Sequence, residues 1–73
     1  MKTYKGSQNS GVTEYEFKKD SIILKFKDGR TYLYSARRLG KIHVDEMKNF
    51  AIAGHGLTGY VNKYVRDNYD TKT

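Results

Sequence analysis

The chain has 73 residues and a formal net charge of +6 at pH 7, from 14 Lys and Arg against 8 Asp and Glu. This length allows one domain at most, and the core leaves little room for a deep catalytic cavity. The absence of cysteine excludes disulfides and thiolate metal sites. No stretch approaches the ~20 apolar residues of a membrane helix, and residues 1–10 lack the apolar run of a signal peptide, so we expect a cytoplasmic protein.

The two ends of the chain are predicted to lie outside the folded domain. Residues 1–11 are rich in glycine, serine and lysine, and we expect a flexible arm there, with Tyr4 as a candidate anchor. Residues 12–69 are expected to form a single α+β domain, and residues 70–73 to form a frayed tail.

Alternating hydrophobicity predicts three strands, over residues 12–18, 21–27 and 30–34. The hairpin between the last two, at Asp28 and Gly29, has two possible registers. A two-residue loop pairs Leu24 with Leu33 and places Tyr32 on the lysine-bearing face. A three-residue loop with a bulge at Gly29 pairs Leu24 with Tyr32 and places the tyrosine in the core. The second register is favoured because it gathers more aromatic area on one buried face.

Helical spacing of apolar residues predicts a helix over residues 36–53, with Ser35 as its N-cap. Gly40 lies inside this pattern, so the helix is expected to be kinked there or to start later. Gly54 supplies the left-handed residue that ends it, and Thr58 is predicted to cap a second helix. The resulting fold class is α+β, a three-stranded antiparallel meander followed by two α-helices packed on one sheet face.

No residue pattern in the chain indicates catalysis, a cofactor or a metal. His43 lies on the apolar side of its predicted helix and is expected to be a satisfied core histidine, and His55 lies in a glycine-rich loop. Two histidines without a third ligand at metal spacing make no zinc site. The loop 54–59 has free N–H groups for an anion or is a tight turn between helices, and the second interpretation is favoured. We therefore expect no enzyme.

Basic residues near the predicted sheet form the candidate nucleic-acid site. Two lysines in the second strand region point away from the apolar face, an open basic sheet can follow a phosphate backbone, and exposed aromatics can stack on bases. Glu14 and Glu16 are expected to share this face and to weaken its field, so a mixed solvated surface stays an alternative. The candidate contacts are Lys25, Lys27, Arg30, Arg37, Arg38 and Lys41.

Two stretches of the chain follow a recognisable pattern. The first is residues 22–34, Ile-Ile-Leu-Lys-Phe-Lys-Asp-Gly-Arg-Thr-Tyr-Leu-Tyr, and the second, after a helical segment, is Gly-Tyr-Val-Asn at 59–62 with Val-Arg at 65–66. Together they resemble the KTSC family. This domain is named after the C-terminal part of some lysyl-tRNA synthetases and also occurs alone in small bacterial and phage proteins. The resemblance covers residues 12–69, although the chain has no proline where family members often carry a Val-Pro step. It implies an RNA-related role, and the motif positions are Tyr32, Tyr34, Gly59, Tyr60 and Asn62.

Two functions are compatible with these features. The first is a module that binds RNA or single-stranded nucleic acid, as the positive charge, the open sheet and the resemblance favour. The second is a protein-interaction module, a small homodimer or a phage accessory protein, which buries the exposed Ile23, Ile42 and Ile52 against a partner. Neither function involves a membrane or a metal.

Overall fold

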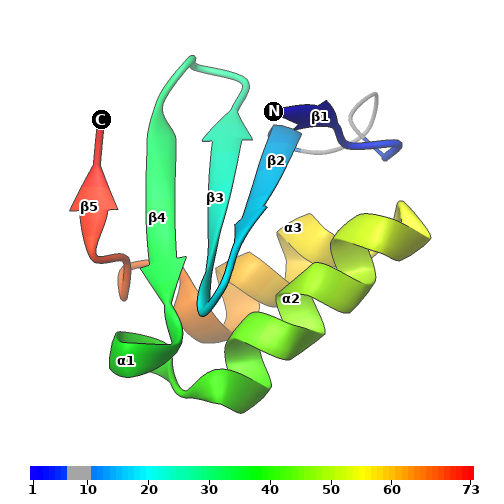
Figure 1. The fold of residues 1–73 in the computed structure, drawn as a ribbon. Coiled ribbons are helices and arrows are strands. Elements are labelled where there is room, and N and C mark those ends of the chain that lie inside the picture. The colour runs from blue at the N-terminus through cyan, green and yellow to red at the C-terminus, as the bar shows by residue number, and fades with distance from the viewer. Residues whose placement is uncertain (7–10) are drawn as a thin grey trace.

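Figure 1 shows the computed structural model of the chain, which describes residues 1–6 and 11–73. A five-stranded antiparallel sheet with strand order β1-β2-β3-β4-β5 carries helices against one face. The strands are β1 (Lys2–Thr3), β2 (Val12–Lys18), β3 (Ser21–Phe26), β4 (Thr31–Ser35) and β5 (Thr71–Lys72). The helices are α1 (Ala36–Leu39), α2 (Lys41–Ala53), α3 (Leu57–Tyr60) and the π-helix η2 (Val61–Val65). None of the helices in the described ranges has the length and apolar character to cross a bilayer.

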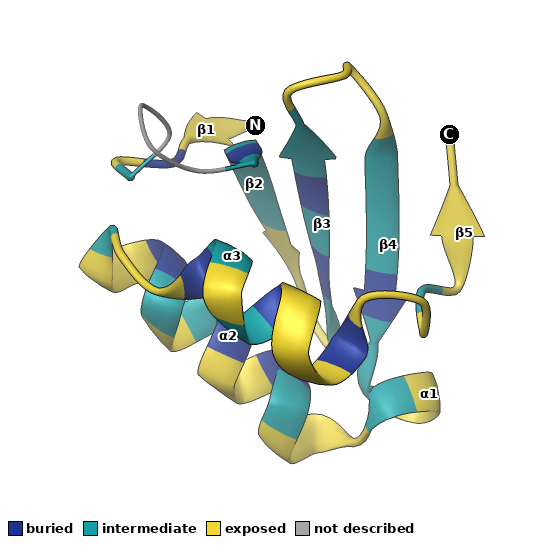
Figure 2. Ribbon diagram, turned by 180° about the vertical axis from the view of Figure 1, so that it is seen from behind, coloured by how far each residue is buried: buried dark blue, intermediate teal, exposed yellow. Residues whose placement is uncertain are grey.

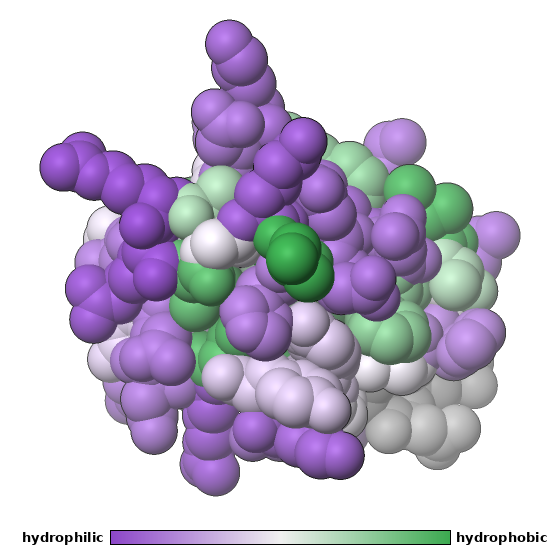
Figure 3. Space-filling model, turned by 90° about the horizontal axis from the view of Figure 1, so that it is seen from below, coloured by the Kyte–Doolittle hydropathy of each residue, from purple (hydrophilic) through white to green (hydrophobic). Residues whose placement is uncertain are grey.

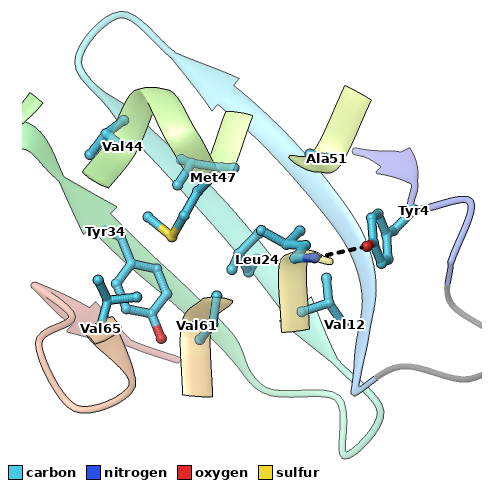
Figure 4. Close-up of a cluster of buried hydrophobic side chains, with 11 residues drawn as sticks. Tyr4, Val12, Leu24, Tyr34, Val44, Met47, Ala51, Val61 and Val65 are labelled. Carbon is cyan, nitrogen blue, oxygen red and sulfur yellow. Dashed lines mark hydrogen bonds between the residues drawn. The ribbon is translucent and has the colours of Figure 1, made fainter. Parts of the chain in front are cut away.

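The core lies between the inner face of the sheet and the helices. Because side chains alternate along a strand, Ile22 and Leu24 of β3 point to the same face, and both are fully buried. The side chains that cover them come from α2, α3 and η2, at helical spacing. Figure 4 shows this cluster, and Figure 2 shows that the buried bands of β3 and β4 meet the buried sides of the helices. The predicted α+β class is confirmed.

The favoured register of the β3–β4 hairpin is also confirmed. Leu24 pairs with Tyr32, and the Phe26 N–H donates to the carbonyl of Arg30 at 2.9 Å. Gly29 has φ 87°, a left-handed conformation that only glycine adopts without strain and that the bulged loop requires. This register places Tyr32 and Tyr34 on the inner face, with the apolar residues of β3.

The predicted first helix is divided in two at Gly40, which has φ 97° and ψ 146°. Ser35 is the N-cap of α1, as predicted, and its hydroxyl accepts the N–H of Arg38 at 3.3 Å. Gly54 ends α2 in a left-handed conformation, and its N–H donates to the carbonyl of Phe50 at 3.0 Å. The prediction for Thr58 is wrong. The N-cap of helix α3 is Gly56, two residues earlier, and the Thr58 hydroxyl accepts the N–H of Val12 at 3.3 Å.

Both ends of the chain add a strand to the predicted meander. In the expected arm, β1 pairs with β2 and Tyr4 is fully buried, so residues 2–4 are part of the folded domain and not a flexible arm. Residues 7–10 of that segment lie outside the described residues. In the expected frayed tail, β5 pairs with Tyr32 and Leu33 of β4. The sheet therefore has five strands and not the predicted three. The sequence did not predict β1 and β5 because a two-residue strand is too short to show an alternating pattern.

Candidate functional site

The six predicted nucleic-acid contacts do not lie on one surface. Lys25 is on the outer face of the sheet, where its Nζ lies 3.5 Å from a carboxylate oxygen of Glu14 on the neighbouring strand. Arg30, beside the hairpin tip with Lys27, has its Nε 3.8 Å from a carboxylate oxygen of Asp28. The Lys25–Glu14 pair reduces the positive field of the outer face, as expected from the position of Glu14 in the sequence.

The other three predicted contacts lie at the opposite end of β4. The hairpin with Lys27 and Arg30 precedes this strand, whereas Arg37 and Arg38 belong to α1, which follows it (Figure 1). Lys41 opens α2, directly after α1. The length of the strand separates the two basic groups, so a ligand that contacts one group at the hairpin does not meet the other without crossing the sheet.

The three isoleucines proposed for a protein interface are also dispersed. Ile42 and Ile52 are 78% and 64% exposed. They stand at opposite ends of α2, about 15 Å apart along its axis at a rise of 1.5 Å per residue. Ile23 lies on the outer face of the sheet and is half-buried. Seen from the end that carries α1, the strongly apolar surface is divided by hydrophilic side chains (Figure 3). The three residues therefore form no common patch.

The two histidines hold positions of different kinds. His43 is half-buried, and its Nδ1 lies 2.6 Å from the Tyr60 hydroxyl. Burial raises the pKa of Tyr60, and the nearby carboxylate of Glu46 and the ring of Tyr64 add to the effect. His55 is exposed in the turn between α2 and α3. Among the described residues, His, Asp and Glu form no cluster of three that could hold a metal ion.

The glycine-rich turn after α2 borders a hollow of about 390 Å³. The first N–H of the helix that follows, that of Leu57, already has a hydrogen-bond acceptor. The Leu57 N–H donates to the Tyr4 hydroxyl at 3.1 Å, the dashed line in Figure 4. The Tyr4 hydroxyl thus satisfies the first N–H of α3, which is therefore not free to bind an anion. This geometry agrees with the favoured interpretation of the loop as a tight turn between helices.

A separate hollow of about 220 Å³ lies where the hairpin end of the sheet meets η2. Strand alternation directs the β3 and β4 aromatics to this side, and η2 supplies residues from the opposite wall. Asn62 and Arg66 are four residues apart and stand on one helical face. The lining residues are Phe26, Asp28, Tyr32, Tyr34, Val61, Asn62 and Arg66. We call this the Tyr32 hollow.

Aromatic rings surround Tyr32 within the hollow. Its ring centroid lies 5.1 Å from that of Phe26, 6.4 Å from that of Tyr34 and 4.9 Å from that of Tyr69. The Nζ of Lys72, on β5, lies 5.5 Å from the Tyr32 centroid, a cation–π contact. Tyr32 is half-buried, so part of its surface remains open to a ligand.

Tyr34 forms the fixed floor of the hollow. It is fully buried, and its hydroxyl donates to the carbonyl of Arg66 at 3.3 Å. Burial raises the pKa of this hydroxyl above its ordinary value, and the charges of Tyr32, Asp67 and Tyr69 raise it further. The hydroxyl is therefore a neutral structural donor that fixes the end of η2 against β4.

The structure brings three of the five motif positions together. Tyr32 and Tyr34 come from β4, and Asn62 comes from η2, yet all three line one hollow. Tyr60 points instead to His43, and Gly59 stands exposed on α3 with open space around its Cα. The sequence reasoning missed Phe26 and Arg66 as partners of this site. Two signals were available, because both residues lie in the stretches that resemble the KTSC family and Arg66 follows Asn62 at helical spacing.

No family model, curated protein or solved structure matches the chain.

Proposed function

We propose that this protein is a small non-catalytic module that binds single-stranded nucleic acid, RNA first, at the Tyr32 hollow. The observation that carries the proposal is the combination of two half-buried aromatic rings, Phe26 and Tyr32, with Arg66 in one concave site, beside the Lys72 ammonium that contacts the Tyr32 ring. An unstacked base contacts Tyr32 and Phe26, and such stacking is worth about 1–3 kcal/mol per base. The two cations contact the adjacent phosphates.

Charge and hydrogen-bonding capacity around the hollow support this assignment. Asp28 is the one carboxylate in the lining, and Arg30 offsets it through their ion pair. Arg66 in the lining and Lys72 beside it add two positive charges, against the nearby carboxylate of Asp67. The Asn62 amide offers both a donor and an acceptor to the edge of a base. The proposed site thus lies on the side of the sheet opposite the outer face, where the sequence analysis expected the nucleic acid.

Membership of the KTSC family, a bacterial or phage origin and a cytoplasmic location stay predictions from the sequence. Tyr32, Tyr34 and Asn62 all line one hollow. This supports the resemblance, because motif residues from two separate stretches of the chain, 22–34 and 59–62, come together in the fold. The alternative role in protein interaction rests on another surface, at the opposite edge of the sheet.

The test is an NMR titration of labelled protein with a short mixed-sequence single-stranded RNA, first at low and then at moderate salt. Arg66→Gln should weaken binding at least about fivefold, because a charge-assisted phosphate contact is lost. Arg37→Gln is the matched control, since it removes the same charge at the far end of β4, and it should weaken binding less than about twofold. Affinity should fall with salt, with a log–log slope of about −0.7 per phosphate contacted.

Two results would contradict the proposal. If no signal moves at low salt, the protein does not bind single strands. If Arg66→Gln and Arg37→Gln weaken binding equally, net charge alone attracts the RNA and the Tyr32 hollow is not the site.

A further inference from the structure

A third hollow, of about 450 Å³, lies at the opposite edge of the sheet from the Tyr32 hollow. Strands β1 and β2 form one wall, and the C-terminal half of α2 forms the other. The lining residues are Met1, Lys2, Tyr15, Glu16, Phe17 and Ile52. We call this the Phe17 groove. Nothing in the proposed nucleic-acid site uses it.

The groove gathers apolar side chains that the core does not bury. Phe17 is 38% exposed and Ile52 is 64% exposed, although both border the same space. The ring of Tyr15 stands 5.2 Å from that of Phe17, centroid to centroid, and extends the apolar wall. Ile42, the most exposed apolar residue on α2, lies outside the lining. A cluster of exposed apolar side chains indicates an interaction site more strongly than one isolated exposed side chain does.

The sheet edge beside the groove is only partly paired. Strand β1 pairs with Glu14 and Tyr15 of β2, and the Tyr4 N–H donates to the carbonyl of Thr13 at 2.9 Å, so among the described residues the pairing extends away from Phe17. Phe17 therefore lies beyond the last residue that β1 covers, whereas the carbonyl of Lys18 already accepts from the Lys48 ammonium at 2.8 Å. An extended peptide can use an open strand edge for main-chain hydrogen bonds while its side chains enter neighbouring pockets.

The margin of the groove is positively charged. Lys2 belongs to the lining, and the Nζ of Lys48 lies 5.6 Å from the centroid of the Phe17 ring. The one carboxylate in the lining, Glu16, already has the Nζ of Lys18 at 3.5 Å. Three lysines thus stand against one paired glutamate. This charge disfavours a second copy of the chain, whose own net charge is +6, and favours an acidic partner.

We propose that the Phe17 groove docks an extended acidic peptide segment of a partner protein. One or two apolar side chains of the segment lie against Phe17, Tyr15 and Ile52. Flanking carboxylates face Lys2 and Lys48, and the peptide main chain runs along the open edge of β2. Lys48 also donates to the carbonyls of Lys18 and Lys19, at 2.8 and 3.4 Å, which fixes its ammonium group at the margin.

The probe is a capped peptide of sequence Asp-Glu-Leu-Phe-Glu-Asp, added to labelled protein and followed by NMR. Two comparison peptides replace Leu-Phe by Ser-Ser, or all four carboxylates by lysines. The acidic apolar peptide should shift the signals of Tyr15, Phe17 and Ile52, and each comparison peptide should bind at least about fivefold more weakly, because each lacks one of the two attractions.

Two variants of exposed α2 residues separate the groove from a general charge effect. Ile52→Asp should weaken binding of the acidic peptide at least about fivefold, since it removes an apolar contact and adds a like charge inside the groove. Ile42→Asp makes the same change outside the groove and should weaken binding less than about twofold. The proposal is overturned if the two variants behave alike, if the lysine peptide binds equally well, or if the shifts fall at the Tyr32 hollow. A single-stranded RNA that shifts the groove signals in place of the peptide would overturn it as well.

Discussion

Two fully buried tyrosines, Tyr4 and Tyr34, use their hydroxyls in opposite directions. The Tyr4 hydroxyl accepts the buried N–H of Leu57, whereas the Tyr34 hydroxyl donates to the carbonyl of Arg66, an exposed residue. A buried N–H that loses its acceptor has no replacement, but a carbonyl near solvent can bind water. The same chemical deletion at the two sites therefore has different consequences.

Tyr4→Phe should lower the free energy of unfolding by about 1–3 kcal/mol, the cost of an unsatisfied buried donor. Tyr34→Phe should lower it by about 0.5–1.5 kcal/mol, the net value of an ordinary hydrogen bond. Urea unfolding followed by far-UV circular dichroism measures both. A larger loss for Tyr34→Phe than for Tyr4→Phe would show that Leu57 finds another acceptor.

Tyr34 should also make the protein sensitive to alkaline pH. Its pKa is raised by burial above the ordinary 10.0, so below that pH the tyrosine is protonated in both the folded and the unfolded chain. As pH rises above about 10, the unfolded chain loses the proton while the folded chain keeps it. The free energy of unfolding then falls by up to about 1.4 kcal/mol per pH unit from this group. Tyr34→Phe should show a smaller decline between about pH 9 and pH 11, and parallel declines would refute this account.

Single-residue signals in the sequence were reliable where the chemistry is local. Ser35 caps α1 and Gly54 ends α2 because a hydroxyl or a glycine at a helix end acts on backbone groups within a few residues. The prediction for Thr58 failed because its partner, Val12, is distant in the chain. Tyr4 could be named as a candidate anchor, but its bond to Leu57 spans 53 positions, and no local pattern records it.

At the scale of elements, the break between α1 and α2 depends on the backbone of one glycine. Gly40 has φ 97° and ψ 146°, a region that residues with a Cβ avoid, and an added Cβ there would meet nothing within 4 Å. Gly59, inside α3, also has open space around it but has no positive φ. Both positions have room for a Cβ but differ in backbone conformation, so they can be compared directly.

Gly40→Ala should destabilise the fold by about 1–3 kcal/mol, because the substitution strains the backbone. Gly59→Ala should stabilise it by about 0.5–1 kcal/mol, because alanine loses less conformational freedom in a helix. Thermal and urea unfolding measure both changes. Equal effects of the two substitutions would mean that the chain between α1 and α2 rearranges when Gly40 is replaced.

The longer elements could be predicted from their periodicity, and the shorter ones could not. Strands β2, β3 and β4 alternate clearly, and the bulge at Gly29 set the hairpin register through turn geometry. Strands β1 and β5 have two residues each, and pairing with a longer neighbour is what defines them. The π-helix was not predicted either, because its apolar residues fit an ordinary helical stripe equally well.

At the scale of the molecule, the sequence showed an excess of basic residues but not how the fold distributes them. The count of basic residues is independent of the fold, whereas their separation by the length of β4 depends on it. The Tyr32 hollow exists only because η2 returns to the hairpin end of the sheet and brings Asn62 and Arg66 to the β4 aromatics. The sequence separation between the β4 aromatics and residues 62 and 66 does not predict that they come together.

The ring cluster around Tyr32 also has an optical consequence. The chain has no tryptophan, so tyrosine dominates its near-ultraviolet absorption. Three neighbouring rings stand 4.9 to 6.4 Å from that of Tyr32, close enough for their electronic transitions to couple. Such coupling produces circular dichroism in this region only while the rings hold fixed mutual orientations. The near-ultraviolet circular dichroism of the protein therefore reports on the candidate site without any added label. A base that enters the hollow should change this spectrum directly.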